Sequence, residues 1–349
     1  QRLVLKLRKR EKQQSVKHKL PALDKITPEQ VKELLLASGN WPFIKQRPYD
    51  IVADPNATPK AIFISALATA PLSAQFGVIL EGQQDAFQTG IDMLSKLSPN
   101  LHLSIGAQES SQIAETKNCT IHRVKGPHPA GNVGVQIHHI DPVNKNDIVW
   151  STTPAGLIQI GKLFSKGIYD ASKIISLVGS SVEKPMYYKC LSGFSVNDLI
   201  SKNVSYDNIR VISGNVLTGT SIGNDGYLGF YDNMITVIPE GNNHAFLGWI
   251  MPIVNKLSFQ RAFGLLSFLN PNKKYKLDTN TNGELRAFVQ SGVFEKVLPM
   301  DILPTYLFKS ILANDYDEME ELGIYELIEE DVALCEFVDV SKNEIQKLL

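Results

Sequence analysis

Cysteine is scarce in this sequence, with three residues among 349. Cys119, Cys190 and Cys335 are widely spaced, and no Cys-x-x-Cys pair occurs. A small, odd number of cysteines fits a reducing compartment and excludes a disulfide framework. It also excludes a local zinc knuckle or a cysteine-ligated iron–sulfur cluster, because each takes about four ligands. We therefore expect no metal site in this chain.

Long apolar runs and targeting segments are missing as well. The longest apolar stretch, residues 61–72, is interrupted by Ser65 and Thr69. A membrane-spanning helix needs about 20 apolar residues, so the sequence predicts no such helix. There is no signal peptide, and the chain starts with Gln1 rather than methionine, which indicates a fragment or a processed product.

An overall excess of one charge is also absent, because 35 Lys and Arg face 36 Asp and Glu. The net charge of −1 argues against a nucleic-acid binder. The charge is nevertheless unevenly spread: residues 1–20 carry eight basic residues and one acid, and residues 301–349 carry thirteen acids and three lysines. The two segments are either a solvated linker and a solvated helical face, or docking surfaces for partners of opposite charge.

The common phosphate-loop and nucleophile motifs do not occur: GxGxxG, GxxxxGK[ST] and GxSxG are all absent. One Gly/Pro-rich loop remains, and its Gly126, Gly131 and Gly134 are candidates to bind a phosphate, such as that of a flavin, through backbone N–H groups. The alternative is a rigid turn. Four histidines lie nearby, at positions 122, 128, 138 and 139. We expect a strand over 135–140 that sends His138 and His139 to opposite faces, which favours structural roles over a metal site.

The segment after the first helix is the best small-molecule candidate by residue type. Trp41, Phe43 and Tyr49 offer flat apolar faces for a planar ring, and Arg47 can donate to a carbonyl oxygen. These four residues are therefore predicted to line a quinone-binding cleft. The alternative is a hydrophobic staple that locks the first helix onto a sheet.

What is present is a regular alternation of short apolar runs and helical patterns. Thr27, Pro28 and Gln30 form a capping box that starts a helix, and Gly39 ends it. Further helices are expected at Asp85–Leu97 and Pro154–Ser165. Strands are expected at Ala61–Ala66, Leu101–Ile105, Cys119–Val124, Val135–Ile140, Ile148–Thr152 and Ile174–Val178. This order predicts an α/β fold with a largely parallel, Rossmann-like sheet.

The second half of the chain has a different pattern. Strands at Arg210–Gly219 and Met234–Gly241 around a Gly-rich turn predict a small antiparallel, β-grasp-like module. From Leu257 the chain is expected to be mainly helical, with a hairpin-like insert at 274–291 and helical periodicity at 303–312 and 319–328. The predicted units are residues 1–26, the end of a preceding domain and a linker; 27–194, the Rossmann-like domain; 195–270, the β-grasp-like module; and 271–349, the mainly helical region.

Several stretches resemble one known family over nearly the whole chain. They are LLASGNWPFIKQRPYD (35–50), GPHPAGNVGVQIHHIDP (126–142), RVISGNVLTG (210–219), YLGFY (227–231), VIPEG (237–241), FLGWIMP (246–252), NKLSF (255–259), TNTNGELRA (279–287), VLPMDILPTYL (297–307) and LGIYELIEEDVALCEFV (322–338). The sequence is similar to the A subunit of the sodium-translocating NADH:quinone reductase. Members of that family carry a further N-terminal lipoyl-like domain and a C-terminal tail, so the resemblance implies truncation at both ends, with Arg2–Leu7 as the last strand of the lipoyl-like domain.

The resemblance implies a peripheral subunit on the cytoplasmic face of the bacterial inner membrane. The six-subunit complex passes electrons from NADH through FAD, FMN and iron–sulfur centres in other subunits to ubiquinone, and it exports sodium. The family also resembles the flavin subunit of complex I and the C subunit of Rnf complexes. Their glycine-rich flavin loop and cluster cysteines are missing here, since the C-terminal region keeps Cys335 alone. The resemblance therefore implies a chain without catalytic residues or cofactors of its own.

Two roles stay open for a protein of this kind: it is a scaffold for the redox subunits or a ubiquinone-binding component. Two hypotheses from other classes compete with both. One is a self-sufficient flavin enzyme that oxidises NADH and uses Gly126–Gly134 to hold the flavin phosphate. The other is a pure protein-interaction module centred on the β-grasp-like residues 195–270.

Overall fold

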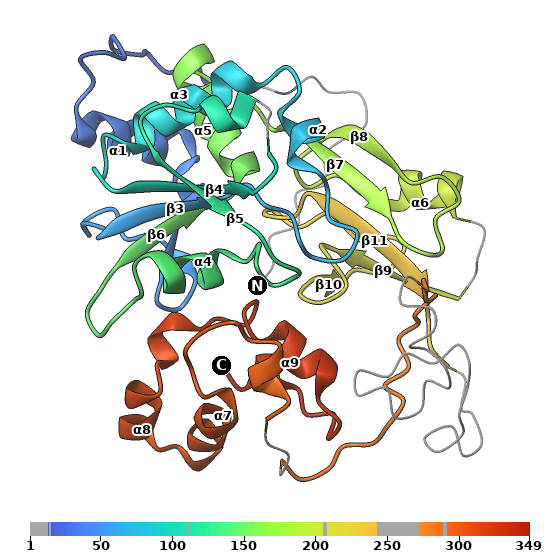
Figure 1. Cartoon of the computed structure of the whole chain (residues 1–349). Helices are drawn as coiled ribbons and strands as arrows, with labels where there is room; N and C mark the ends of the chain where they lie inside the picture. Colours follow the sequence, from blue (N-terminus) through green and yellow to red (C-terminus); the bar gives the residue numbers. More distant parts are fainter. Residues whose placement is uncertain (1–12, 14, 110–111, 205–207, 243–272, 289–291) are drawn as a thin grey trace.

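The computed structural model describes residues 13, 15–109, 112–204, 208–242, 273–288 and 292–349. Two sheets lie next to each other, and a group of short C-terminal helices packs below the first sheet (Figure 1). The mixed α/β fold class is confirmed. The predicted strand at Arg2–Leu7 and the helical stretch expected from Leu257 lie outside the described residues, and the unit limits at 194 and 270 stay predictions.

The first sheet has six strands in the order β2-β1-β6-β3-β4-β5. β3, β4, β5 and β6 run parallel, and β1 joins β6 antiparallel at the edge. The strands are β1 (Lys45–Arg47), β2 (Ile51–Val52), β3 (Ala61–Ser65), β4 (Leu101–Gly106), β5 (Thr120–Val124) and β6 (Val149–Thr152). The largely parallel sheet predicted from the sequence is therefore present, with an added antiparallel edge.

Helices cover both faces of this sheet, because its strands alternate apolar side chains between two cores. Ile62 and Ile64 of β3 face the larger core, which also takes side chains from α1, α3 and α5. Ala61 and Phe63 face the opposite side, where they pack against Ile137 of α4. The helices of this part are α1 (Pro28–Ser38), α2 (Phe76–Leu80), α3 (Gln84–Leu94), α4 (Val133–Ile140) and α5 (Pro154–Lys166), with 3-10 turns η1 (Trp41–Phe43) and η2 (Gln112–Glu115).

Local signals place α1 and α5 where the sequence predicts them. The Thr27 side chain accepts from the Gln30 backbone while Gln30 reaches back to Thr27, and Gly39 closes the helix in the left-handed region. α5 begins at Pro154 after a Thr153 cap. Gly161 of α5 lies so close to α3 that an added Cβ would stand 1.7 Å from the Ala86 carbonyl oxygen. The close approach of these two helices therefore depends on glycine.

The strand predicted over Val135–Ile140 is wrong, because these residues form most of α4. The short segment fits both the strand and the helix periodicity, and the helix forms because it places apolar side chains in two cores. Val133, Ile137 and Ile140 lie at i, i+4 and i+7 and face β3, while Val135 joins the C-terminal core. The side chains of His138 and His139 consequently project from the last turn of a helix and not from opposite faces of a strand.

The second sheet has the order β10-β9-β11-β7-β8, with β7 and β11 parallel and the other pairs antiparallel. The strands are β7 (Ser172–Val178), β8 (Met186–Leu191), β9 (Ile209–Ser213), β10 (Thr220–Ser221) and β11 (Met234–Pro239), with α6 (Asn197–Asn203) beside them. Ile174–Val178 was expected in the first sheet, and this placement is wrong. β7 instead pairs with β8 and β11, and both of these strands follow it in the chain.

The C-terminal region packs around its own apolar core, which includes Phe294, Phe308 and Val332. Its elements are η4 (Phe294–Lys296), α7 (Pro304–Ala313), α8 (Tyr316–Glu321), η5 (Ile324–Glu326), α9 (Ala333–Val338) and η6 (Ile345–Lys347). The helical periodicity at 303–312 matches α7. The stretch 319–328 is divided at Gly323, where the backbone turns left-handed. Residues 273–288, the part of the expected hairpin insert that the structure describes, contain no strand.

Candidate functional site

A cavity of about 580 Å³ lies where the first sheet meets the C-terminal region. One wall is built from the carboxyl end of β5, the following loop and α4; the other comes from residues 296–299 and Leu334. Ligands of open α/β sheets commonly bind beyond the carboxyl ends of the parallel strands. The cavity therefore lies in the part of the fold where a small-molecule site is expected.

The lining of this cavity combines apolar side chains with positive charge. Val135, Ile140 and Val297 contribute to the apolar wall. Arg123, Lys125 and Lys296 supply the charge, and the described lining contains no Asp or Glu. Arg123 is held in place by the carbonyl oxygens of residues 107 and 109. The cavity is thus suited to a largely apolar ligand that carries electron-rich oxygen atoms or an anionic group.

His128 lines the cavity as a neutral hydrogen-bonding group. Its Nδ1 lies 3.1 Å from the Thr69 hydroxyl, which itself accepts from the Gly131 N–H at 2.9 Å. We assign the Thr69 hydroxyl as the donor to Nδ1, which leaves the ring proton on Nε2. Burial lowers the pKa of His128, so the imidazole is neutral at pH 7. The ring then offers one N–H donor.

Gln136 lines the same cavity and has an acceptor without a partner. Its Nε2 donates to the Ser65 hydroxyl at 2.8 Å and to the Ala130 carbonyl at 3.1 Å. The Ser65 hydroxyl donates to the Gly131 carbonyl, so it can only accept from Gln136, which settles the orientation of the amide. The buried Oε1 has no hydrogen-bond partner among the described residues. A buried acceptor left in this way is costly unless a ligand or water donates to it.

His122 reaches the cavity from β5 and pairs with a second histidine. Its Nε2 lies 3.0 Å from Nδ1 of His102 on β4, and the His102 ring stacks on Phe63. Burial lowers the pKa of both rings, and the neighbouring His122 lowers that of His102 further. The pair therefore shares one hydrogen bond between two neutral rings at pH 7.

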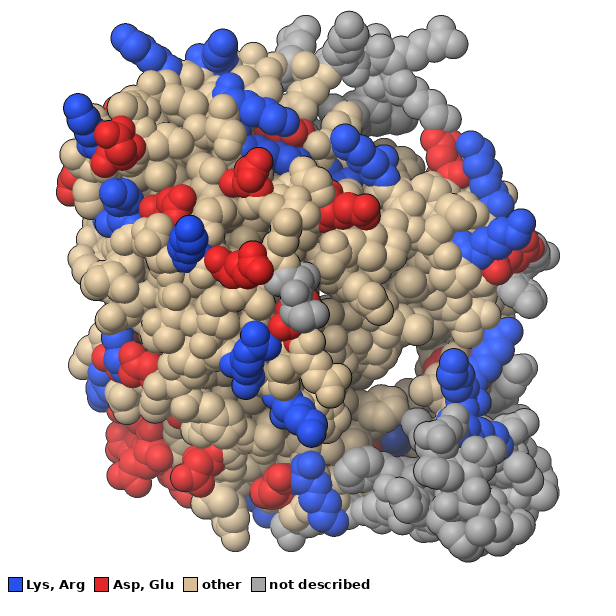
Figure 2. All heavy atoms as spheres, turned by 45° about the horizontal axis from the view of Figure 1, so that its top comes forward, with Lys and Arg blue, Asp and Glu red and all other residues tan. Residues whose placement is uncertain are grey.

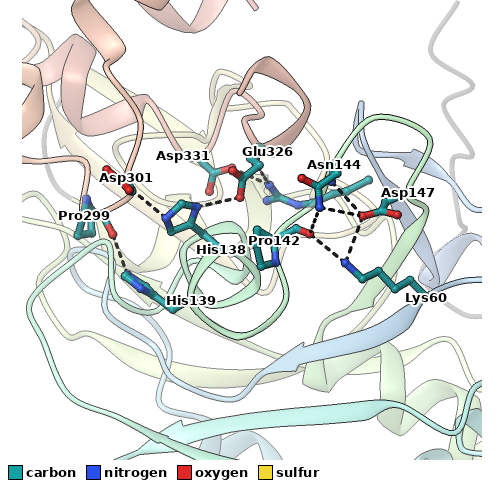
Figure 3. A network of polar contacts seen from close by, with 11 residues as sticks. Lys60, His138, His139, Pro142, Asn144, Asp147, Pro299, Asp301, Glu326 and Asp331 are labelled. Atoms are coloured by element: carbon teal, nitrogen blue, oxygen red, sulfur yellow. Dashed lines mark hydrogen bonds and ion pairs between the residues drawn. The ribbon is translucent and has the colours of Figure 1, made fainter. Parts of the chain in front are cut away.

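Two adjacent histidines of α4 hold the far wall of the cavity (Figure 3). His139 lines the cavity, and its Nε2 donates to the Pro299 carbonyl at 2.8 Å. His138 lies beside it and accepts from the Asp301 N–H at Nε2, which leaves Nδ1 to donate to Glu326 at 2.8 Å. The two side chains thus clamp the segment 299–301, whose Pro299 lines the cavity.

A buried ion pair anchors the same interface. Nη1 of Arg47 lies 2.7 Å from Oδ2 of Asp331, and both side chains are at most 1% exposed. The same nitrogen donates to the Glu326 carbonyl at 3.0 Å. Gly134 makes room for the pair, since a Cβ there would stand 2.3 Å from the Asp331 carboxylate. Burial, followed by the negative charge of Asp331, raises the pKa of the neighbouring Glu330 to about 7.

The four residues predicted to form a quinone cleft do not converge. Trp41 is buried, donates to the Ala53 carbonyl and meets Trp150 edge-on in the main core. Phe43 stacks on Phe230, at a ring distance of 4.8 Å. Arg47 belongs to the ion pair with Asp331, and Tyr49 is 69% exposed. None of the four lines the cavity.

The three candidate glycines likewise do not form one open cradle. Gly126 lines the cavity. The Gly131 N–H is already bound by Thr69, and the space beside Gly134 is filled by the Asp331 carboxylate. The sequence pattern favoured structural roles for His122, His128 and His139 over metal binding, and it did not reveal their common cavity. Within the described part of the chain, no three His, Cys, Asp or Glu side chains are grouped to hold a metal ion.

The far wall carries no local sequence signal. Lys296 and Leu334 come from segments more than 150 residues away from the loop. The near wall is marked in the sequence by the Gly/Pro-rich loop and the histidines around it. The structure also contains, in its described residues, no helix with the length and apolar character needed to cross a membrane.

Comparisons with known proteins cover both sheets. Residues 26–169 match the family model described as NqrA second alpha/beta domain, and residues 174–223 match NQRA C-terminal domain. Two relatives, from Pasteurella multocida and Histophilus somni, are each named as the A subunit of a Na(+)-translocating NADH-quinone reductase. Each is 38% identical over 351 residues, which covers 100% of this chain and 78% of theirs.

A solved structure is similar over part of the chain. It is the NAD+-reducing [NiFe]-hydrogenase in the air-oxidized state, 13% identical, with a TM-score of 0.43 over 62% of this chain and 50% of that one. A likeness of this size supports no argument about function. The family matches and the identity over the full chain lead to one conclusion: this chain belongs to the NqrA family, the A subunits of the Na(+)-translocating NADH-quinone reductases.

Proposed function

We propose that this chain is a peripheral subunit that binds the ring of ubiquinone in the cavity between the first sheet and the C-terminal region. The name of its relatives supplies the quinone as substrate class. The observation that carries the proposal is that His128, assigned above as an Nε2–H donor, and Gln136, whose buried Oε1 has no partner among the described residues, line the same largely apolar cavity. A volume of about 580 Å³ lies within the range of small-molecule sites, about 300–1,000 Å³.

The chemistry of the two groups suits both redox states of such a ring. A quinone carbonyl accepts from the imidazole N–H of His128. A quinol hydroxyl can donate to Oε1 of Gln136, which then gains the partner that the protein does not provide among its described residues. Lys125 and Lys296 favour the more electron-rich ring through their positive charge. The chain would thus bind and orient the ring rather than carry electrons.

The remaining parts of the proposal follow the family. The chain would act as a scaffold on the cytoplasmic face of the membrane within a complex of six subunits, without a flavin or iron–sulfur cluster of its own. NADH, FAD, FMN and the iron–sulfur centres would be bound by other subunits. The quinone role predicted for Trp41, Phe43, Arg47 and Tyr49 stays a separate prediction, which the same experiment tests.

The experiment is a calorimetric titration of the purified chain with a short-chain ubiquinone. His128→Phe keeps an aromatic ring but removes the N–H donor. A hydrogen bond worth about 1 kcal/mol predicts a roughly fivefold weaker affinity. Tyr49→Phe, outside the cavity, is the matched control and should bind like the wild type. Unchanged binding by His128→Phe with loss in Tyr49→Ala would move the site to the predicted aromatic cleft.

The flavin-enzyme hypothesis is tested on the same sample. A visible absorbance spectrum is taken before and after FMN is added. We expect no flavin band after removal of free FMN, because the Gly131 N–H is occupied and the space beside Gly134 is filled. A bound flavin near one per chain would contradict the proposal and favour the self-sufficient flavin enzyme.

A further inference from the structure

The cavity between the first sheet and the C-terminal region is lined by charge of one sign. Arg123 lies on β5, Lys125 follows that strand, and Lys296 is the last residue of η4. Glu295 precedes Lys296 in the chain, but the described lining contains no Asp or Glu. Over most of the face shown in Figure 2, by contrast, basic and acidic side chains are interspersed. The cavity therefore differs from that face in carrying positive charge alone.

This positive charge is not neutralised by carboxylates within the described part of the chain. Arg123 donates to the carbonyl oxygens of residues 107 and 109, which carry no formal charge. Lys125 and Lys296 take part in no ion pair among the described residues. Both lysines are exposed, so water and salt screen each of them, but the two act on the same bound ligand. A negatively charged ligand therefore gains attraction from both.

The neutral polar groups of the lining call for one acceptor and one donor on the ligand. The neutral ring of His128 offers its Nε2–H. Gln136 is 3% exposed, and its Oε1 lacks a donor among the described residues. His122 and His139 are already hydrogen-bonded within the protein. A ligand thus completes the lining when it accepts one hydrogen bond, donates another and carries negative charge.

Among the states of a quinone ring, one meets all three demands. The oxidised quinone has no hydroxyl to donate to Gln136, and the neutral quinol has no charge for the lysines. The dianion places a negative oxygen against the Oε1 of Gln136. The monoanion keeps one hydroxyl as a donor, while its ionised oxygen accepts a charge-assisted hydrogen bond from His128.

We propose that the cavity binds the quinol as its monoanion, with the remaining hydroxyl on Oε1 of Gln136. The ionised oxygen accepts from His128 and is stabilised by the charges of Lys125 and Lys296. The step is an ionisation: the O–H bond breaks, its electron pair stays on the oxygen, and the proton goes to solvent. This inference rests on the proposed function, because it specifies the protonation state of the ring bound there.

The probe is nitrohydroquinone, a para-diol like the quinol, whose monoanion absorbs visible light. Its absorbance is recorded from about pH 5 to pH 9 with and without the purified chain. We expect the bound probe to ionise about one pH unit below the free probe, which corresponds to a roughly tenfold preference for the monoanion. Lys125→Met with Lys296→Met should remove most of this difference. Lys117→Met with Lys202→Met, two exposed lysines outside the cavity, is the matched control and should retain it.

A second probe tests the donor to Gln136 from the side of the ligand. The compound 2-nitrophenol keeps the ionisable hydroxyl and lacks the second one. It should bind roughly fivefold more weakly than nitrohydroquinone, because Oε1 of Gln136 stays without a donor. Its ionisation should fall by the same amount on binding, since the lysines act on the ionised oxygen. Equal affinities of the two probes would remove Gln136 from the inference.

Two results would overturn the monoanion. The bound diol ionises at the same pH as the free diol, or the lysine variant and its control behave alike. Calorimetry with a short-chain ubiquinone separates this failure from that of the proposed function. If ubiquinone binds and the diol shows no lowered ionisation, only the monoanion is rejected. If neither ubiquinone nor the diol binds, the quinone site itself is rejected. Thermal unfolding of each variant shows that it is folded.

Discussion

Removing one partner of the buried pair between Arg47 and Asp331 should be among the most destabilising single changes in the chain. Asp331→Asn preserves the shape of the side chain and deletes its charge. The guanidinium of Arg47 then stays 1% exposed and loses the carboxylate 2.7 Å from its Nη1, and its Nε and Nη2 already have no partner among the described residues. Removing one partner of a buried ion pair costs about 3–5 kcal/mol.

The assay is unfolding by urea followed by far-UV circular dichroism, combined with hydrogen exchange of α4 and α9. We expect the free energy of unfolding to fall by about 3–5 kcal/mol and exchange to rise on both sides of the interface. The control is Asp50→Asn. Asp50 pairs with Lys45 at the surface, with both side chains about 30% exposed, so its loss should cost less than about 1 kcal/mol.

A double replacement tests whether the unpaired charge of Arg47 causes the loss of stability in Asp331→Asn. Arg47→Met with Asp331→Leu removes both charges and should recover most of the lost stability, because no buried charge is left unpaired. If Asp331→Asn costs no more than Asp50→Asn, the pair does not anchor the C-terminal region. If the double variant is as unstable as Asp331→Asn, packing rather than charge explains the effect.

Three further results are expected. Gly161→Ala should lower the free energy of unfolding by about 2 kcal/mol or more, because its Cβ would collide with the α3 backbone. Gly77→Ala, with open space around its Cβ, should be nearly neutral in the same urea assay. His138→Ala should weaken ubiquinone binding several-fold in calorimetry, because it releases the segment 299–301 beside the cavity, and His138→Gln should restore part of the affinity. Equal affinities of His138→Ala and the wild type would refute the role of His138 in holding this segment. Stability should decrease as pH falls below about 6.5, because the unfolded chain takes up protons that the buried rings resist, and urea midpoints that stay constant from pH 7.5 to 5.5 would contradict this. The rings concerned are His102, His122 and His128.

Much of the first sheet could be predicted because its signals are local. The capping box at Thr27, the proline at the start of α5 and the short apolar runs of β3 and β4 need no distant partner. One error falls where a short segment fits two periods, and the other is the sheet to which β7 belongs. Residues 135–140 fit a strand or a helix, and packing against two cores decided for α4.

The site could be predicted only in part, since its walls come from distant segments. Gly126 and three of the nearby histidines, which the sequence singles out, line the cavity. Trp41 and Phe43 are predicted ligand contacts by residue type, and in the structure Trp41 meets Trp150 in the core while Phe43 stacks on Phe230. Residue type alone cannot separate these two uses, because both depend on the same apolar ring surface.

The sequence by itself determined the α/β class, the family and the positions of the elements with strong local signals. It also determined the acidic character of residues 310–341. Only the tertiary structure decided that β7 belongs to the second sheet, that Asp331 lies against Gly134, and that Lys296 and Lys125 line one cavity. Such pairings depend on how packed elements divide a limited buried volume, and chain order does not contain that information.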